Sequence, residues 1–146
     1  MAPVFAGDVS FRMTDFAVRN AERAGVKQAI EFKTVDALQR PPPAAQGTLL
    51  LNPPYGERIG AKGSGAREGF EEGSGSSAEF FAQLAAHWKR HYAGWSGWIL
   101  SPDMKLPTLM RLKESRRVPV WNGPIECRLF RFDMQAGSLR RDSGGN

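Results

Sequence analysis

The sequence predicts one α/β domain: a three-layer sheet with helices on both faces and one reversed strand at its edge. Three observations lead to this prediction. The chain has 146 residues, 41% of them hydrophobic and 24% charged, which suits a single globular core. Apolar runs of strand length alternate with segments of helical periodicity. An Asn-Gly dipeptide joins the last two strand patterns, which indicates a closing antiparallel hairpin.

The first part of the chain has the pattern of a strand, a helix and two further strands. Residues 4–7 are a short apolar run, and apolar residues then recur at helical spacing up to Gly25, where a helix is expected to end. Residues 29–33 alternate as a strand, and Pro41–Pro43 predict an extended loop. The run Thr48–Leu51 shows no polar alternation, so we expect a central parallel strand covered on both faces.

A segment rich in glycine and serine divides the predicted domain, which extends over residues 1–134. From Gly60 to Ser77, ten of eighteen residues are Gly or Ser, so we expect a mobile insert. A frayed tail is predicted over residues 135–146. The elements expected between insert and tail are a helix from Ser77 to Gly94, a strand over Trp95–Leu100, a short helix over Lys105–Leu112, and the hairpin strands Arg116–Trp121 and Ile125–Phe132 around Asn122-Gly123.

Positive charge is concentrated in the last quarter of the chain. Residues 1–104 hold eleven basic and eleven acidic residues, whereas residues 105–142 hold nine and four, so this quarter carries the whole net charge of +5. Such a field suits a polyanion such as RNA, although a solvated basic surface is an equal alternative. The candidates for phosphate contacts are Arg111, Lys113, Arg116 and Arg117.

The sequence contains no signal for a membrane or an oxidising compartment. No apolar run approaches the ~18 residues of a membrane span, and the N-terminus lacks the pattern of a secretory signal. The lone Cys127 excludes an internal disulfide and a cysteine-based zinc cluster. His87 and His91 have metal-ligand spacing on a helix, but no third ligand is evident. We therefore expect a soluble cytoplasmic protein that holds no metal.

The tetrapeptide Asn52-Pro53-Pro54-Tyr55 follows the buried strand pattern, where open α/β sheets place their ligands. The prolines lack N–H groups and fix an extended backbone. The Asn52 side-chain oxygen and the Pro53 carbonyl can then accept both hydrogens of an exocyclic amine, while the Tyr55 ring stacks on a planar base. Charge developing on the amine nitrogen would be stabilised by the two acceptors. The alternative is a rigid strand exit with an incidental tyrosine.

These residues and two flanking segments resemble the bacterial 23S rRNA guanine-N2 methyltransferases that carry a THUMP domain. The matching segments are Leu51-Asn52-Pro53-Pro54-Tyr55-Gly56-Glu57-Arg58, Asn20-Ala21-Glu22-Arg23-Ala24-Gly25-Val26 and Trp121-Asn122-Gly123-Pro124-Ile125-Glu126-Cys127-Arg128-Leu129. The tetrapeptide alone would also fit methylation of DNA adenine or protein glutamine. The resemblance implies a Rossmann-like class I methyltransferase fold, S-adenosylmethionine as cofactor and ribosomal RNA as partner.

The resemblance also implies the roles of individual residues. Asn52, Pro53, Pro54 and Tyr55 would form the catalytic motif, and Asn52 would also contact the cofactor. Asp8, at the end of the first strand pattern, would bind the ribose hydroxyls, and Asp36 would contact the adenine amino group. The alternatives are a simple turn residue for Asp8 and an Asx turn for Asp36.

One departure from the family pattern concerns the N-terminus. Nothing before Val4 matches the family's first strand, its glycine-rich cofactor loop or its THUMP domain, so the chain resembles the later part of a catalytic domain. The absent strand would lie between Val4–Ala6 and Thr48–Leu51 and would leave an unpaired edge on each. We therefore expect the chain alone to aggregate or fold partly and to bind no cofactor. The alternative function is a non-catalytic, basic fragment that binds RNA or a partner protein.

Overall fold

A computed structural model describes residues 3–53 and 74–135. The chain divides into two compact units, residues 1–43 and 44–146, and each is described by itself. Of the predicted Gly/Ser-rich insert, residues 60–73 lie outside the described residues, as do residues 136–146 of the predicted tail. The extent of the domain, residues 1–134, stays a prediction.

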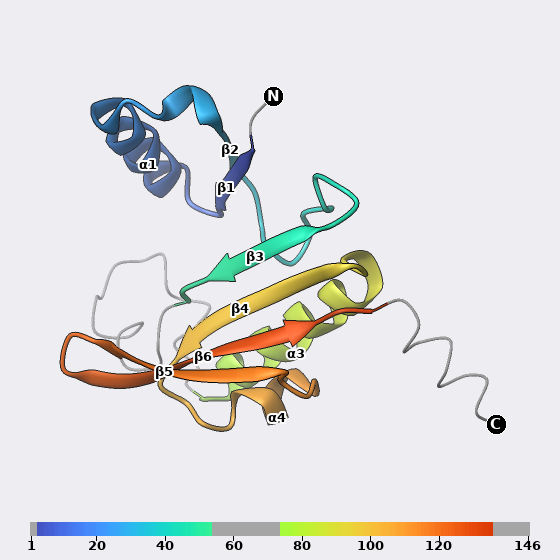
Figure 1. Cartoon of the computed structure of the whole chain (residues 1–146). Helices are drawn as coiled ribbons and strands as arrows, with labels where there is room; N and C mark the ends of the chain where they lie inside the picture. Colours follow the sequence, from blue (N-terminus) through green and yellow to red (C-terminus); the bar gives the residue numbers. More distant parts are fainter. Residues whose placement is uncertain (1–2, 54–73, 136–146) are drawn as a thin grey trace. The chain divides into compact units, whose positions relative to one another are not determined.

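The first unit pairs two parallel strands beside one helix (Figure 1). Strand β1 pairs with β2 in a register that runs from Val4 opposite Ile30 to Asp8 opposite Thr34. Helix α1 contacts both strands. The elements are β1 (Val4–Asp8), α1 (Phe11–Ala24), the 3-10 turn η1 (Lys27–Ala29) and β2 (Ile30–Thr34).

Helix α1 begins and ends at residues suited to those positions. The Ser10 side chain caps the first turn by accepting a hydrogen bond from the Met13 N–H, at 3.3 Å. Gly25 adopts the left-handed conformation, with φ 78°, and its N–H donates to carbonyls of the last turn. The predicted helix end at Gly25 is therefore confirmed.

The second unit is a four-stranded sheet in the order β3-β4-β6-β5, with β3 parallel to β4 and the other pairs antiparallel. The reversed strand is β6, which lies between β4 and β5, so the prediction of a reversed strand at the edge is wrong. Figure 1 shows α3 and α4 on the same side of this sheet. The elements are β3 (Gly47–Leu51), α3 (Ser74–His91), β4 (Trp95–Ser101), α4 (Leu106–Met110), β5 (Arg116–Asn122) and β6 (Ile125–Asp133).

The core of the second unit lies between the sheet and α3. Trp88 of α3 is 3% exposed and packs directly on Gly97 of β4. Ile99, Phe130 and Phe132 are fully buried. Because side chains alternate along a strand, these residues mark the face of the sheet that the helices cover.

Three predicted boundaries differ from the structure. Helix α3 starts at Ser74, three residues before the predicted cap at Ser77, so residues 74–77 are helical and not part of an insert. Helix α4 ends at Met110 because Arg111 adopts a left-handed conformation, with φ 56°. The hairpin turn is Gly123-Pro124, since Asn122 pairs with Ile125. Gly123 has φ 63°, and the fixed φ of proline suits the second turn position.

Strand β3 has one hydrogen-bonded neighbour among the described residues, and so has β1. The absence of a strand that would pair with both of them stays a prediction. The expectation that Thr48–Leu51 is covered on both faces is wrong for this structure, because Leu50 is 74% exposed. Apolar residues indicate what a strand can bury but do not supply the elements that cover it.

Candidate functional site

Two acidic residues of the first unit lie at the same end of its sheet. Asp8 is the last residue of β1, and Asp36 follows two residues after the end of β2. Because β1 and β2 are parallel, their carboxyl ends form one edge. The structure therefore brings the two predicted cofactor-binding carboxylates to one edge, at the place where α/β sheets bind ligands.

Both carboxylates also make turns. The Asp8 Oδ1 accepts a hydrogen bond from the Ser10 N–H at 2.8 Å, and the Asp36 Oδ1 accepts one from the Leu38 N–H at 2.9 Å. The alternatives of a turn residue and an Asx turn thus describe real contacts. They do not exclude binding, because each uses only one carboxylate oxygen, and no described residue donates a hydrogen bond to the other oxygen.

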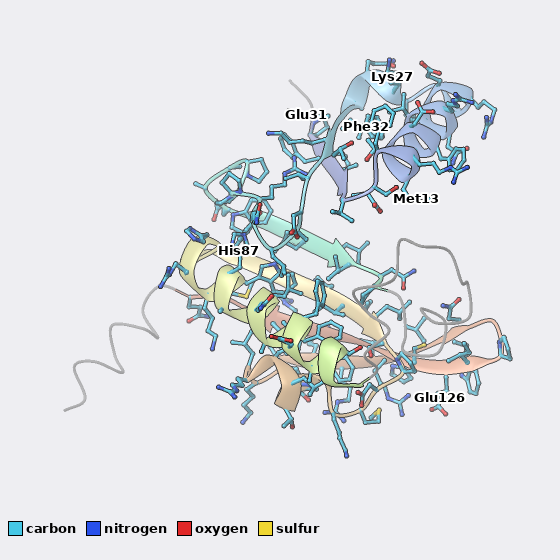
Figure 2. All side chains as sticks on the ribbon, turned by 180° about the vertical axis from the view of Figure 1, so that it is seen from behind. Met13, Lys27, Glu31, Phe32, His87 and Glu126 are labelled. Carbon is cyan, nitrogen blue, oxygen red and sulfur yellow. The ribbon has the colours of Figure 1, made fainter. Side chains whose placement is uncertain are left out.

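A small hollow adjoins the Asp8 carboxylate. Met13 of α1 and Phe32 of β2 line it from two elements (Figure 2). A hollow lined in part by apolar side chains, beside an exposed carboxylate, can hold a planar group while the carboxylate accepts hydrogen bonds from hydroxyls. The complete lining is Ala6, Gly7, Asp8, Met13, Thr14, Ala17 and Phe32.

The predicted catalytic motif begins at the carboxyl end of β3, in the second unit. Asn52 is exposed and Pro53 is buried, immediately after Leu51 pairs with Ile99 of β4. Asn52 therefore lies at the edge of the sheet where the motif was expected. Pro54 and Tyr55 lie outside the described residues, so their predicted roles stay predictions, and Asn52 belongs to a different unit from Asp8 and Asp36.

The same edge of the second unit carries a loop that sequence reasoning did not single out. This loop follows β4. The Ser101 hydroxyl accepts a hydrogen bond from the Asp103 N–H at 3.0 Å, and the Asp103 Oδ1 accepts one from the Lys105 N–H at 2.9 Å. These contacts order the backbone and leave the Lys105 side chain exposed. The sequence signal that could have identified this loop is the short polar segment 102–105 directly after a predicted strand.

The positive charge of the predicted basic region is only partly neutralised. Residues 105–133 hold seven basic and three acidic residues. Each acidic residue pairs with an arginine, in the pairs Glu114–Arg117, Glu126–Arg128 and Asp133–Arg131. Four cations form no ion pair within the described residues: Lys105, Arg111, Lys113 and Arg116.

The Asp133 carboxylate is the centre of a polar cluster. Its Oδ1 accepts hydrogen bonds from the Ser96 hydroxyl at 2.7 Å and the Arg131 Nε at 2.9 Å. Burial alone would raise the pKa of Asp133, but hydrogen bonds from Ser96, Ser115 and Arg131 lower it below the ordinary value. The ionised Asp133 carboxylate therefore links the end of β6 to Ser96 of β4 through a hydrogen bond.

Two negative findings apply to residues 3–53 and 74–135. None of the helices there is both long and apolar enough to cross a bilayer. In the same ranges, no group of three or more His, Cys, Asp or Glu residues could hold a metal ion. The rings of His87 and His91 lie 4.9 Å apart on α3, between centroids.

Curated proteins with similar sequences are ribosomal RNA methyltransferases by name. The ribosomal RNA large subunit methyltransferase K/L of Shewanella sp. (strain W3-18-1) is 35% identical over 139 residues, which are 95% of this chain and 18% of that protein. The protein of the same name from Shewanella baltica (strain OS185) matches at the same identity and coverage. The chain thus spans 18% of the length of these relatives.

Solved structures and a family model agree with this similarity. SMU.472, crystallised with SAH, has a TM-score of 0.76 at 21% identity, over 90% of this chain and 32% of that chain. A possible methylase from Clostridium difficile 630 has a TM-score of 0.74 at 25% identity, over 89% and 31%. These structures confirm the predicted class of fold. The family model described as RMKL-like, methyltransferase domain, matches residues 1–131, and the chain therefore belongs to this family.

Proposed function

We propose that the chain forms part of an enzyme that transfers a methyl group from S-adenosylmethionine to the N2 amine of a guanine in large-subunit ribosomal RNA. The observation that carries the proposal is the position of Asn52-Pro53 at the carboxyl end of β3, in a member of the RMKL-like methyltransferase domain family. The named relatives support ribosomal RNA as the substrate. This substrate would place the reaction in the cytoplasm.

The role of Asn52 and Pro53 follows from hydrogen-bond chemistry. The Asn52 side-chain oxygen and the Pro53 carbonyl are acceptors, and Pro53 has no N–H that would repel a donor. Together they accept both hydrogens of an exocyclic amine and orient its lone pair. They also stabilise the positive charge that develops on the nitrogen during attack, so the amine need not lose a proton first. Tyr55 would stack on the base.

The residues of the first unit fit an adenosine-containing cofactor. The exposed Asp8 carboxylate keeps one oxygen for ribose hydroxyls, and the hollow between Met13 and Phe32 provides apolar contact. Asp36 lies at the same edge and would contact the adenine amino group. When bound, S-adenosylmethionine would supply an electrophilic methyl group.

The proposal includes a further strand, supplied by a segment upstream in a longer protein. In the described residues β1 pairs only with β2, and β3 pairs only with β4. The other outer strand, β5, is protected against further pairing by Arg116, Arg117 and Pro119, whereas β3 has neither charge nor proline. The edge of β3 is therefore suited to another strand. A glycine-rich cofactor loop and a THUMP domain would accompany that strand.

The experiment uses a protein in which residues 1–146 follow the upstream region of the matched Shewanella methyltransferase, here named the extended protein. It is incubated with large-subunit ribosomal RNA that lacks methylation and with S-adenosylmethionine labelled in the methyl group. Mass spectrometry of the digested RNA should show labelled N2-methylguanosine. Labelled N6-methyladenosine would indicate a different target base, and RNA that binds without any labelled nucleoside would support the non-catalytic alternative.

A further inference from the structure

An exposed tryptophan lies at the tip of the β5–β6 hairpin. Trp121 is 62% exposed, whereas Trp88 and Trp95 are 3% and 6% exposed. Tryptophan is rarely left in water without a partner, because its ring is large and apolar. This residue therefore needs an explanation beyond the packing of the sheet.

The hairpin extends past the strand beside it. The pairing of β4 with β6 ends where Ser101 lies opposite Arg128, but β5 and β6 continue to Asn122 opposite Ile125. Trp121, opposite Glu126, lies two residues beyond the end of β4, which is about 7 Å along the strand. Figure 1 shows the hairpin tip beyond the arrowheads of β3 and β4, and Figure 2 labels Glu126 there.

The backbone fixes the direction in which Trp121 points. Side chains alternate along a strand, so Trp121 lies on the opposite face from Val120 and its cross-strand partner Cys127. Cys127 is 1% exposed, which anchors that face of the hairpin. The tight turn at Gly123-Pro124 joins the two strands. By the same alternation Trp121 shares a face with Arg117 and its cross-strand partner Phe130, so it continues the helix-covered face beyond the end of β4, where its ring is exposed.

Trp121 lies at the same edge of the sheet as the proposed catalytic residues. From β3 to β5 there are three strand spacings of about 4.8 Å, which places Trp121 about 15 Å from Pro53. The loop after β4 carries Lys105, whose side chain is exposed and forms no ion pair among the described residues. The loops and the hairpin at this edge therefore supply a pair of hydrogen-bond acceptors after β3, a cation in the loop after β4 and an aromatic ring at the end of β5.

We infer that Trp121 and Lys105 hold the RNA strand beside the target nucleotide, and this inference rests on the proposed function. An unpaired base stacks on the Trp121 ring, and a backbone phosphate contacts the Lys105 ammonium. Stacking on an exposed aromatic ring is tolerant of sequence, and a lysine beside it follows the backbone. Trp121 is thus a positioning residue for single-stranded RNA, and it does not touch the reacting atoms.

The test measures RNA affinity of the extended protein by fluorescence anisotropy, with a short single-stranded RNA and a duplex of the same length. Trp121→Leu keeps apolar area but removes the aromatic ring, and should weaken single-stranded binding about tenfold because one stacked base is lost. Trp121→Phe should stay within about threefold, since a ring remains. Lys105→Ala should reduce the slope of log affinity against log salt concentration by about 0.7. Arg90→Ala, in the last turn of α3 that leads to the start of β4, is the matched control and should leave affinity for single-stranded RNA unchanged.

The same variants separate this inference from the proposed function. With saturating RNA, Trp121→Leu should keep the wild-type rate of methyl transfer, while the KM for RNA rises about tenfold. Wild-type methylation together with an unchanged KM for Trp121→Leu would overturn the inference and leave the proposed function standing. Equal weakening of single-stranded and duplex binding would also overturn it, because paired bases cannot stack on the ring. Absence of methylation by the wild-type protein would instead refute the proposed function.

Discussion

The carbonyl oxygen of Asp8 accepts a hydrogen bond of 2.9 Å from the N–H of Val35. This bond continues the β1–β2 ladder by one residue beyond Thr34. It therefore joins the end of β1 to the residue directly before Asp36. The two carboxylates are held at one edge by backbone hydrogen bonds, and side-chain substitutions at either position should leave this geometry intact.

Asp8→Asn should weaken S-adenosylmethionine binding to the extended protein by at least about tenfold. The variant keeps the size of the side chain but replaces a charged acceptor, and hydrogen bonds to charged groups contribute about 1.5–3 kcal/mol. Isothermal titration calorimetry measures the change. Glu31→Gln is the matched control, because Glu31 is an exposed carboxylate in the middle of β2. Equal affinities for the two variants would contradict the role of Asp8.

Gly97→Ala should destabilise the second unit by about 1–3 kcal/mol. A Cβ at residue 97 would lie 2.4 Å from the buried Trp88 ring, which cannot move without disturbing the core. Thermal denaturation of the extended protein measures the loss. Combining Gly97→Ala with Trp88→Leu should cost less than the sum of the single changes, since the smaller side chain makes room. Strict additivity would show that the ring does not restrict this position.

The stability of the second unit should fall in acid through Asp133. The folded state lowers the pKa of this carboxyl below its ordinary value of 3.8, so its stabilising effect is present above that value and is lost as the pH falls through the lowered pKa. Asp133→Asn should cost about 1–3 kcal/mol at pH 7 and much less in strong acid. Urea denaturation across this pH range checks it. Glu126→Gln is the control, because Glu126 forms an exposed ion pair with Arg128, and its loss should cost under about 1 kcal/mol. A cost for Asp133→Asn that does not vary with pH would contradict the prediction.

Leu50→Lys should reduce self-association of the 146-residue chain. Leu50 is 74% exposed on β3, whose outer edge lacks a strand, and a lysine there discourages intermolecular pairing. Size-exclusion chromatography with light scattering measures the oligomers. Val9→Lys is the control, because Val9 is 71% exposed outside any strand. The edge would not be responsible if both changes reduced association equally.

Local sequence patterns predicted most elements of the fold. The helix that ends at Gly25 and the strand over Trp95–Leu100 depend on interactions between neighbours in the chain, and both are present. The hairpin was also predicted, but its turn is shifted by one residue. Proline at 124 fits a turn better than a strand, and this preference outweighs that of Asn122-Gly123. The environment of Leu50 was predicted wrongly because burial depends on elements distant in sequence.

Only part of the candidate site was predicted, because some of its features depend on elements that are distant in sequence. Asn52 was identified because it follows a strand pattern, whereas Asp8 and Asp36 were identified through the resemblance to the family. The structure places all three at the end of a strand or within two residues of it. Trp121 was noted only within a family motif. Trp121 lies two residues along the hairpin beyond the last pair of β4 with β6. The register between strands, which sets this offset, cannot be derived from the sequence of one strand.

The most direct test of the proposed function is the effect of Asn52→Ala on the extended protein. S-adenosylmethionine affinity and the rate of methyl transfer to RNA are measured on the same preparation. Affinity should change less than about threefold while the transfer rate falls at least ~10²-fold, because the lost acceptor matters most as charge develops on the amine. A transfer rate close to that of the wild-type protein would contradict the proposed catalytic role of Asn52, and so would a loss of rate matched by an equal loss of cofactor affinity.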